Sequence, residues 1–493
     1  MPLEGMVQLN ETTFASYVQA RYHQASEGPL TDFLSRRGGN LYLGDALNLN
    51  ELVARYGAPL EVVYYPQITK QIRQMQAWAQ EAREATGYRG KFLYTYATKA
   101  NFAAEVVQTA LAAGAHYETS AANDVEIAHY LWEEGLLPQA RLILCNGSKE
   151  PHYLAAILNL RLAGHPNVLS ILDDLEELEE LRNCPLPLAF GVRERAAGNR
   201  AGNHLGNNRF GLTGAEIEDV VKQLEGSPHR LILYHAMVGT QIEDSDHFLA
   251  LLHDSMIAYC QLRRKVPSLR YFDFGGGMPT SGYKLDFKFD YAAFMHRLMA
   301  QMRLVCQDYN VPMPDLIGEF GRYTVANHSL FLFEVGQVKE GQQDAPAWYL
   351  LNGSLMVSFP DMLLVEDQEF VVLPLDDWDA PVTPVRLAGR RTCDSDDLYP
   401  RPHQEPLLLP ATGKGLTVAV CGAGAYQQMI AGRGGAHHCL NPEPRRVEAR
   451  EVKGQLILRS QAPQSKAAIM QQLGYAPSRV AIPLPQVAHR KAS

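Results

Sequence analysis

The feature that most constrains the fold is a regular alternation of short apolar runs with helix-like segments. Segments such as AAEVVQTALAAG and DVEIAHYLWEEG carry apolar residues at helical spacing between the runs. Eight strand-like runs occur, at residues 92–97, 116–120, 142–146, 168–174, 188–194, 231–237, 271–276 and 316–321. Strands that alternate with helices predict a parallel sheet, and eight such units predict a (β/α)8 barrel of the α/β class. A doubly wound open sheet is the alternative, because periodicity cannot show closure.

The segments on either side of these units have a different pattern of apolar residues. Residues 41–66 predict a strand, a short helix and a second strand, and a long helical pattern follows to about Thr86. After residue 330, runs such as LFLFEVG, WYLLNG and LTVAVCG are separated by Pro, Gly and Asp, with little helical period. This pattern predicts an antiparallel β domain at the C-terminal end.

Composition narrows the class of protein. The chain has 493 residues, 46% hydrophobic and 20% charged, which is enough for a large core and two domains. A net charge of -9 argues against nucleic acid as a partner and is compatible with a cationic small-molecule substrate. We also expect no membrane partner, since neither a signal peptide nor a spanning apolar run is seen.

Cysteine usage points to a reducing compartment. The seven cysteines are scattered and none has CxxC spacing, so a disulfide framework or structural zinc is not expected. The adjacent residues His437, His438 and Cys439 cannot easily converge on one ion, and we expect no metal. The prediction is a cytoplasmic protein.

Several polar residues lie at the carboxyl ends of the predicted strands, the end of a barrel at which function resides. They are Lys99, Glu118, Asn146, Asp173, Asp174, Arg193, His235, Gly275–Gly277 and Glu319–Arg322. A lysine directly after a buried strand is a natural partner for an aldehyde, with which it forms a Schiff base. Position alone favours the alternative, a rim lysine paired with a carboxylate such as Glu118.

Two glycine-containing loops suit an anion. Gly275–Gly277 after YFDF would let backbone N–H groups approach a phosphate, although a tight turn is an equally simple reading. No later glycine completes the dinucleotide pattern GxGxxG. In EFGRY, Gly321 and Arg322 suit a phosphate and Glu319 could hold a protonated pyridine nitrogen. An internal Glu–Arg pair is the alternative.

The C-terminal region adds two motifs. Thr392–Asp397 (TCDSDD) places a thiol among carboxylates, which suits a cationic side chain and a proton donor, or else a solvated acidic turn. Cys421–Tyr426 (CGAGAY) places a tyrosine after a flexible turn, and a core tyrosine is the alternative.

In this order, YATKAN, ETSAANDVEI, GTQI, FDFGGG, EFGRYTV, TCDSDD and GAGAY resemble the barrel-type pyridoxal-phosphate decarboxylases of ornithine, arginine and diaminopimelate. The resemblance runs from about Leu41 to Pro444. It implies an alanine-racemase-like barrel, a β domain that includes an N-terminal strand, and a homodimer with shared active sites. The domain division it suggests is 1–60 as an N-terminal contribution to the β domain, 61–328 as the barrel and 329–493 as the C-terminal β domain.

The resemblance also implies residue roles. Lys99 carries pyridoxal 5'-phosphate and Glu319 binds its ring nitrogen, so that the ring acts as an electron sink. Cys393 returns a proton to the α-carbon after carbon dioxide leaves. The resemblance assigns contacts with the phosphate and the ring to Thr240, Gly276, Gly277, Gly321, Arg322 and Tyr426. Glu118 and Glu126 match acidic positions near the lysine. Contacts with the substrate are assigned to Asp394, Asp397 and Asn352.

Two positions depart from the family pattern. Where the family usually stacks a histidine on the pyridine ring, this chain has Met237, with His235 two residues earlier. Either a bulge lets His235 stack or Met237 packs there through its sulfur, and we favour Met237. Asn352 stands where members with basic substrates often have an aspartate, and an amide cannot neutralise a cation.

The TCDSDD, CNGSKE and EFGRYTV segments are most similar to bacterial arginine decarboxylases. We therefore predict decarboxylation of arginine to agmatine, a step of polyamine biosynthesis, ahead of ornithine, lysine or diaminopimelate. A racemase on the same fold would need a second catalytic base that we do not find. A catalytically dead regulator would be expected to lose the lysine or the phosphate loops. A nicotinamide oxidoreductase would need its glycine signature after an early strand.

Overall fold

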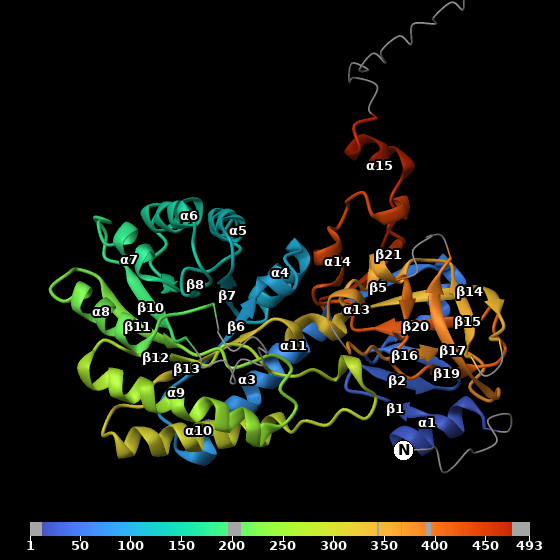
Figure 1. The fold of residues 1–493 in the computed structure, drawn as a ribbon, viewed down its shortest axis with the longest axis horizontal. Coiled ribbons are helices and arrows are strands. Elements are labelled where there is room, and N and C mark those ends of the chain that lie inside the picture. The colour runs from blue at the N-terminus through green and yellow to red at the C-terminus, as the bar shows by residue number, and fades with distance from the viewer. Residues whose placement is uncertain (1–11, 196–208, 343–344, 366, 391–395, 476–493) are drawn as a thin grey trace, which may run out of the picture.

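Eight parallel strands close into a barrel in the order β10-β11-β12-β13-β6-β7-β8-β9 (Figure 1). The computed structural model describes residues 12–195, 209–342, 345–365, 367–390 and 396–475. The barrel strands are β6 Phe92–Ala97, β7 His116–Thr119, β8 Ile143–Cys145, β9 Val168–Leu172, β10 Ala189–Arg193, β11 Arg230–His235, β12 Tyr271–Asp273 and β13 Asp315–Phe320. Each predicted run forms one of these strands. The barrel prediction is confirmed, and the open sheet is excluded.

Helices surround the barrel and alternate with its strands. They are α3 Pro66–Thr86, α4 Ala104–Ala112, α5 Ala122–Glu133, α6 Pro151–Leu162, α7 Leu175–Leu181, α8 Gly214–Leu224, α9 Ser245–Lys265, α10 Tyr291–Asp308 and α11 Arg322–Val325, with short 3-10 turns at Thr98–Ala100, Ser281–Tyr283 and Ala326–His328. Local sequence fixes several starts, because Asp174, Asp244 and Asp290 accept backbone N–H bonds as N-caps. Thr213 and Glu216 form a reciprocal capping box before α8.

The second domain is built from both ends of the chain. Its N-terminal elements are α1 Phe14–Tyr22, β1 Gly28–Pro29, β2 Leu34–Arg37, β3 Asn40–Leu43, β4 Leu47–Asn48, α2 Leu49–Tyr56 and β5 Leu60–Tyr64. Its C-terminal elements are β14 Ser329–Lys339, β15 Ala347–Leu351, α12 Leu355–Ser358, α13 Asp361–Leu364, β16 Val372–Pro374, β17 Val382–Gly389, β18 Leu398–Tyr399, β19 Leu407–Pro410, β20 Thr417–Cys421, α14 Gln427–Ala431, a 3-10 turn at His438–Leu440, β21 Arg445–Val452, β22 Gln455–Gln461 and α15 Lys466–Gln472.

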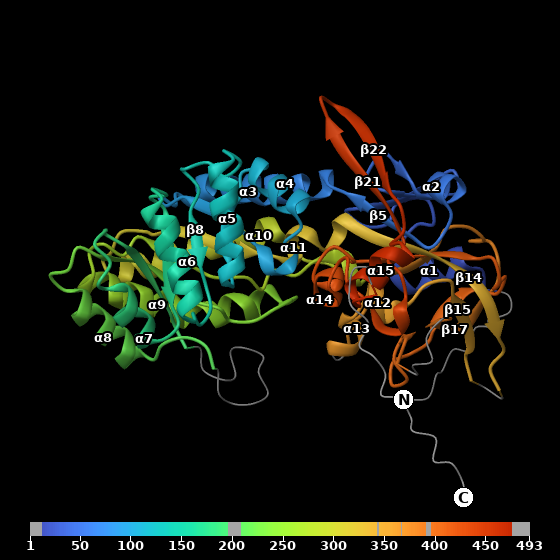
Figure 2. The same ribbon diagram turned by 90° about the horizontal axis from the view of Figure 1, so that it is seen from above.

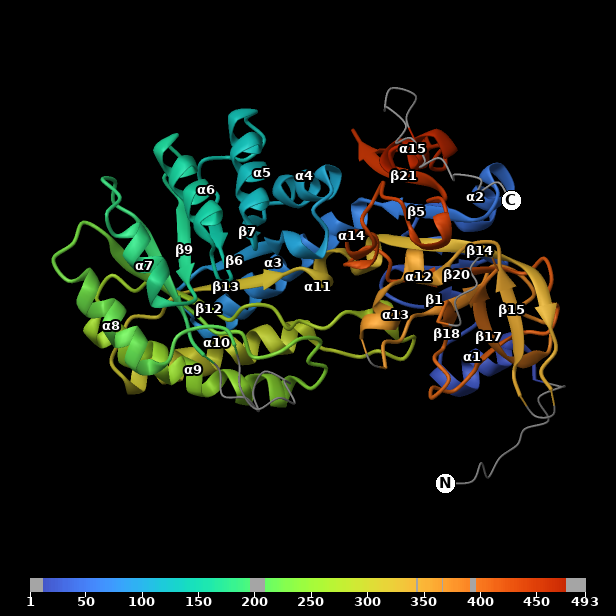
Figure 3. The same ribbon diagram turned by 45° about the horizontal axis from the view of Figure 1, so that its top comes forward.

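Strand pairing joins these ends into one larger sheet. β14 pairs antiparallel with β5, β15 and β20, while β5 also pairs in parallel with β21. The predicted antiparallel domain is confirmed for most pairs, and β15 with β17 is a second parallel pair. Figure 2 shows the β21–β22 hairpin projecting from this domain, and Figure 3 shows α13 and α14 on its side nearest the barrel. The division at about residues 60 and 328 stays a prediction.

The barrel interior explains where polar chemistry can lie. Its lower layers are an apolar cluster that includes Leu144, Leu233, Tyr271 and Ile317. Side chains two residues apart on a strand point to the same face. The next inward positions toward the carboxyl ends are therefore Asn146, His235, Asp273 and Glu319, all buried. The polar layer at the mouth of the barrel therefore lies directly on this apolar cluster.

None of the helices in the described part of the chain is long and apolar enough to span a membrane.

Candidate active site at the carboxyl end of the barrel

Glu319 is the centre of the polar layer. Its Oε1 accepts a 2.6 Å hydrogen bond from the Asn146 amide, and its Oε2 lies 3.2 Å from Nε2 of His235. Burial acts to raise the pKa of Glu319, but His235 and Lys99 outweigh it and lower that pKa to about 2. A carboxylate that remains ionised at the base of the cavity can hold a protonated ring nitrogen.

Lys99 lines the cavity above this layer, two residues beyond the end of β6. Its side chain is accessible to solvent through the cavity, while the strand ends around it are buried. The carboxylate of Glu118 raises the pKa of Lys99 against the desolvation that would lower it. Lys99 is therefore a cavity amine whose charged form is favoured by Glu118, and its role as the partner of an aldehyde stays a prediction.

Glu118 is the second buried carboxyl group of the site. Its side chain is fully buried at the end of β7, where its Oε1 accepts a 3.2 Å hydrogen bond from Asn146. Burial raises the pKa of Glu118 to about 8, although Lys99 acts in the opposite direction. Asn146 therefore bridges Glu118 and Glu319. The sequence placed Asn146 at a strand end and gave it no role.

Asp273 is a third buried carboxyl group, which the sequence analysis missed. Its Oδ1 accepts the N–H of Gly275 at 2.8 Å. Burial, followed by repulsion from Glu319, raises its pKa well above the usual range. His235, Asp273 and Glu319 each place a ligand-type atom within 4.8 Å of the other two, a spacing that could also hold a cation. Because Glu319 also lines the cavity of Lys99, we assign this cluster to the same site.

Glycines line the opposite wall of the cavity. A Cβ on Gly276 would lie 3.1 Å from the carbonyl oxygen of Glu319, and Gly277 has φ +89°, which favours glycine. A Cβ on Gly321 would come within 3.0 Å of the Ala100 side chain. Glycines let backbone N–H groups approach the cavity closely, and such groups bind an anion such as phosphate.

Arg322 and Tyr426 complete this wall. The guanidinium carbon of Arg322 lies 4.5 Å from the centre of the Tyr426 ring, a cation–π contact between the barrel and the β20–α14 loop. Nη1 of Arg322 donates to the Tyr283 hydroxyl at 2.7 Å and to Oδ2 of Asp361 at 3.2 Å. Asp361 is a second residue that the sequence analysis missed. It is the first residue of a short helix in the other domain, without a recognisable motif.

The structure separates Met237 from His235. Met237 lines the cavity, and its sulfur accepts the Gly276 N–H at 3.3 Å, whereas His235 lies below against Glu319. Thr240 also lines the cavity. This arrangement supports Met237 at the face of a bound ring and His235 as a partner of Glu319.

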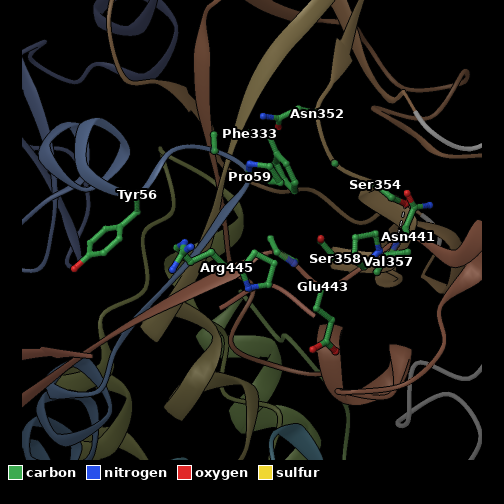
Figure 4. A pocket seen from close by; sticks show the side chains of 15 residues that line it. Tyr56, Pro59, Phe333, Asn352, Ser354, Val357, Ser358, Asn441, Glu443 and Arg445 are labelled. Atoms are coloured by element: carbon green, nitrogen blue, oxygen red, sulfur yellow. Dashed lines mark hydrogen bonds between the residues drawn. The ribbon is translucent and has the colours of Figure 1, made fainter. Parts of the chain in front are cut away.

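Other predicted site residues lie elsewhere. Asn352 lines a separate cavity of about 340 Å³ in the β domain, together with Phe333 and Arg445 (Figure 4). Asp397 is buried, and its Oδ1 accepts the N–H of Met356 at 2.8 Å. Glu126 is exposed on α5, so the structure does not bring it into the cavity of Lys99. Cys393 and Asp394 lie outside the described residues.

The groups in this cavity fit a phosphorylated pyridine aldehyde. The lysine amine matches the aldehyde, the ionised Glu319 matches a protonated ring nitrogen, and the glycines and Arg322 match a phosphate. A closed (β/α)8 barrel that carries this set at its mouth, beside a β domain, defines the class of barrel proteins with a pyridoxal-type cofactor site.

Comparison with known proteins agrees with this class. Residues 69–326 match the family model "Pyridoxal-dependent decarboxylase, pyridoxal binding domain", and the chain belongs to this family. The biosynthetic arginine decarboxylase of Vibrio vulnificus is 28% identical over 297 residues, which cover 56% of this chain and 46% of that protein. The corresponding protein of Neisseria meningitidis is 27% identical over 321 residues, covering 59% and 49%. The chain thus spans about half the length of the curated relatives it matches.

Solved structures show the same fold. The biosynthetic arginine decarboxylase SpeA from Campylobacter jejuni has a TM-score of 0.77 at 18% identity and covers 93% of this chain and 92% of its own. Diaminopimelate decarboxylase from M. jannaschii, in complex with L-lysine, has a TM-score of 0.75 at 20% identity and covers 90% and 97%.

Proposed function

We propose that this protein is a pyridoxal-phosphate-dependent decarboxylase of a basic amino acid, with L-arginine as the first substrate to test and agmatine as the product. The observation that carries the proposal is that Lys99, Glu319, the Gly276–Gly277 loop and Arg322 line one cavity at the mouth of the barrel. Family membership supports the same reaction class.

Different residues would hold the aldehyde and ring of the cofactor and its phosphate. When bound, pyridoxal phosphate supplies an aldehyde that condenses with amines and a ring that accepts the electron pair left by departing carbon dioxide. Lys99 provides the amine that holds and then releases the aldehyde end. Glu319, held by Asn146 and His235, keeps a proton on the ring nitrogen. Met237 lines the cavity and would lie against the ring face, where its thioether adds no titrating group.

The phosphate end is held by backbone and by one cation. Gly276, Gly277 and Gly321 present close backbone, and Arg322 offers the charge that a phosphate needs. The Tyr426 ring packs against the Arg322 guanidinium at this end of the cavity, and Thr240 contributes a hydroxyl group to the cavity lining.

Three observations favour arginine. The curated relatives compared above, from Vibrio vulnificus and Neisseria meningitidis, are biosynthetic arginine decarboxylases. The net charge of -9 and the acidic TCDSDD segment suit a cationic side chain. In this segment, Cys393 is the proposed proton donor to the α-carbon, and Asp394 and Asp397 are the proposed partners of the distal cation. Asn352, an uncharged amide, would contribute a hydrogen bond rather than a charge.

We further propose a cytoplasmic homodimer with shared sites. Exposed apolar side chains at Leu363, Leu364 and Val365 support a covered surface on the β domain. The free cysteines of the described residues support a reducing compartment. If sites are shared, mixing inactive Lys99→Ala and Cys393→Ala chains restores about a quarter of the activity, because half the dimers then have one intact site. If each site is built from one chain, mixing restores none.

The first experiment compares wild type with Lys99→Ala, and uses Lys91→Ala as a control at the opposite end of β6. Each protein is incubated with pyridoxal phosphate, its visible absorbance is recorded, and carbon dioxide release is measured with arginine, ornithine, lysine and meso-diaminopimelate. We expect a cofactor band and turnover of one basic amino acid in wild type and Lys91→Ala, and neither in Lys99→Ala. A flat spectrum in all three proteins contradicts the cofactor assignment. A band without turnover of any basic amino acid contradicts the substrate assignment.

A further inference from the structure

Asp361 connects the two parts of the proposed phosphate wall that come from different domains. It is 2% exposed and begins α13, which lies between the β sheet and the barrel (Figures 1 and 3). Its Oδ2 accepts from Nη1 of Arg322 at 3.2 Å and from Nε2 of Gln427 at 2.8 Å. Its backbone N–H donates to Oε1 of Gln427 at 3.2 Å. One buried carboxylate therefore holds a barrel residue and the first residue of α14, which directly follows the β20–α14 loop.

On the barrel side, these bonds fix the orientation of the guanidinium. Nη1 of Arg322 has two hydrogens, and the Tyr283 hydroxyl and Asp361 are acceptors for both. Within the described part of the chain, the side-chain hydrogen bonds of Arg322 all leave from Nη1, so the edge formed by Nε and Nη2 can face another acceptor. A planar donor with one nitrogen fixed presents its other donors in a defined direction.

On the loop side, Gln427 follows a strained turn. Tyr426 has φ +69° and ψ -51°, and the N–H of Gln427 donates to the carbonyl of Ala425 at 2.9 Å. These values describe a γ-turn of the rare strained hand, which persists only where the surroundings hold it. The N–H of Tyr426 donates to Ala100 on the barrel side at 2.7 Å, and the two bonds between Gln427 and Asp361 hold the other side.

We propose that Asp361 is a positioning residue for the phosphate end of the cofactor. It orients Arg322 directly and holds Tyr426 in its strained turn through Gln427. Asp361 itself does not line the cavity, and it acts through residues that do. This proposal rests on the proposed function, because it requires the anion in this cavity to be the cofactor phosphate.

The test measures whether Asp361 acts on the phosphate in particular. The full chain, freed of cofactor, is titrated with pyridoxal phosphate and, separately, with pyridoxal, which has the same aldehyde and ring without phosphate. The ratio of the two dissociation constants isolates the phosphate contribution, because Lys99 and Glu319 serve both ligands. The variants are Asp361→Asn, which keeps the shape and removes the charge, and Gln427→Met, which removes the amide bridge.

Asp315→Asn is the matched control. Asp315 is a carboxylate at the opposite end of β13 from Arg322, and it is paired with Arg270 at 2.8 Å. We expect Asp361→Asn to reduce the preference for the phosphorylated ligand about tenfold, the scale on which such supporting hydrogen bonds act on bound groups. Gln427→Met should reduce the preference less, and Asp315→Asn should leave it unchanged.

An unchanged or increased preference in folded Asp361→Asn would overturn the proposal, and an increase would show that Asp361 competes with the phosphate. If Asp361→Asn does not fold, Gln427→Met decides by the same criterion. Wild-type protein that binds neither aldehyde would instead contradict the proposed function, which is a distinct result.

Discussion

Nε2 of His235 lies 3.2 Å from Oε2 of Glu319 inside the barrel, with both side chains almost fully buried. The two residues come from β11 and β13, which are separated in the barrel by β12. This pair holds the pKa of Glu319 low in surroundings that would otherwise raise it, with Lys99 acting in the same direction.

Removing His235 should therefore make the proposed activity sensitive to acid. With the pKa of Glu319 at about 2, wild type shows no loss from this group between about pH 5 and pH 8. In His235→Leu, the histidine no longer counteracts the effect of burial on Glu319. The pKa of Glu319 therefore rises, and its carboxylate becomes protonated as the pH falls. We expect the affinity for pyridoxal phosphate in this variant to fall about tenfold per pH unit below the new pKa.

The measurement is cofactor affinity as a function of pH for wild type, His235→Leu and His229→Leu. His229 is also a buried barrel histidine, but it bonds to Leu188 and Arg182, away from the cavity. A pH profile for His235→Leu that runs parallel to wild type would contradict the role of this pair.

Glu118 should make stability fall as the pH rises. Its pKa of about 8 in the folded protein compares with 4.5 ordinarily, so between these values the folded state binds more protons than the unfolded chain. Folding stability then decreases with increasing pH across this window. Replacing Glu118 with Gln removes the titrating group and should flatten the decline, a difference on the order of 1–3 kcal/mol over the window.

Thermal unfolding of the cofactor-free protein at several pH values between about 5 and 8 checks this slope. Glu126→Gln, on the exposed face of α5, serves as the control and should reproduce the wild-type slope. A wild-type slope retained in Glu118→Gln would show that Glu118 is ionised throughout.

Gly424 should not tolerate a side chain. A Cβ there would lie 1.9 Å from the carbonyl oxygen of Val325 and 2.2 Å from Nδ1 of His328, so the loop that carries Tyr426 would have to move away from the barrel. We expect Gly424→Ala to lower the free energy of unfolding by about 2–4 kcal/mol and to weaken cofactor binding. Urea unfolding measures the loss. Gly214→Ala, at the start of α8 with open space around its Cβ, should be neutral or slightly stabilising. Equal stability of the two variants would refute the close approach.

Met237 should contribute apolar contact rather than charge. Truncation to Ala removes Cγ, Sδ and Cε and should weaken cofactor binding by about one to two orders of magnitude, in line with the loss of up to three buried methylene-sized groups. Met237→Leu keeps a similar volume and should stay within about threefold of wild type. The ratio between the variants should not change with pH, since neither side chain titrates. If Met237→Ala binds as wild type does, Met237 does not contact the ring.

The sequence was a sufficient guide to the barrel because each of its strands is a local pattern. An apolar run such as FLYTYA or LIGEF is recognisable without its neighbours, and the alternation with helices fixes the parallel order. The short strands at Gly28–Pro29 and Leu34–Arg37 were not predicted, because they are too short to show a period and exist through pairing with neighbours.

Within the active site, too, local patterns identified some residues, while others are recognisable only in the packed structure. Lys99, Glu319 and Arg322 could be named because each lies at the carboxyl end of a recognisable strand, and chemistry restricts what a lysine or a glycine–arginine loop can do there. Asn146 was visible as a strand-end residue and Asp273 was missed, because the roles of both depend on side chains from other strands. Asp361 and Gln427 carry no motif, so only the packed structure places them against Arg322.

By itself, the sequence determined the strand–helix units, the parallel sheet and the residues at the carboxyl ends of the strands, because period and turn chemistry act within a few residues. Only the tertiary structure decided which of these residues meet. It set Met237 rather than His235 at the cavity, joined His235 to Glu319, placed Asn352 in a different cavity and brought Asp361 from the β domain to Arg322. The physical reason is that hydrogen bonds, ion pairs and the pKa shifts they cause depend on distances of a few ångströms between residues far apart in the chain. Barrel closure and domain packing set these distances, and no local pattern encodes them.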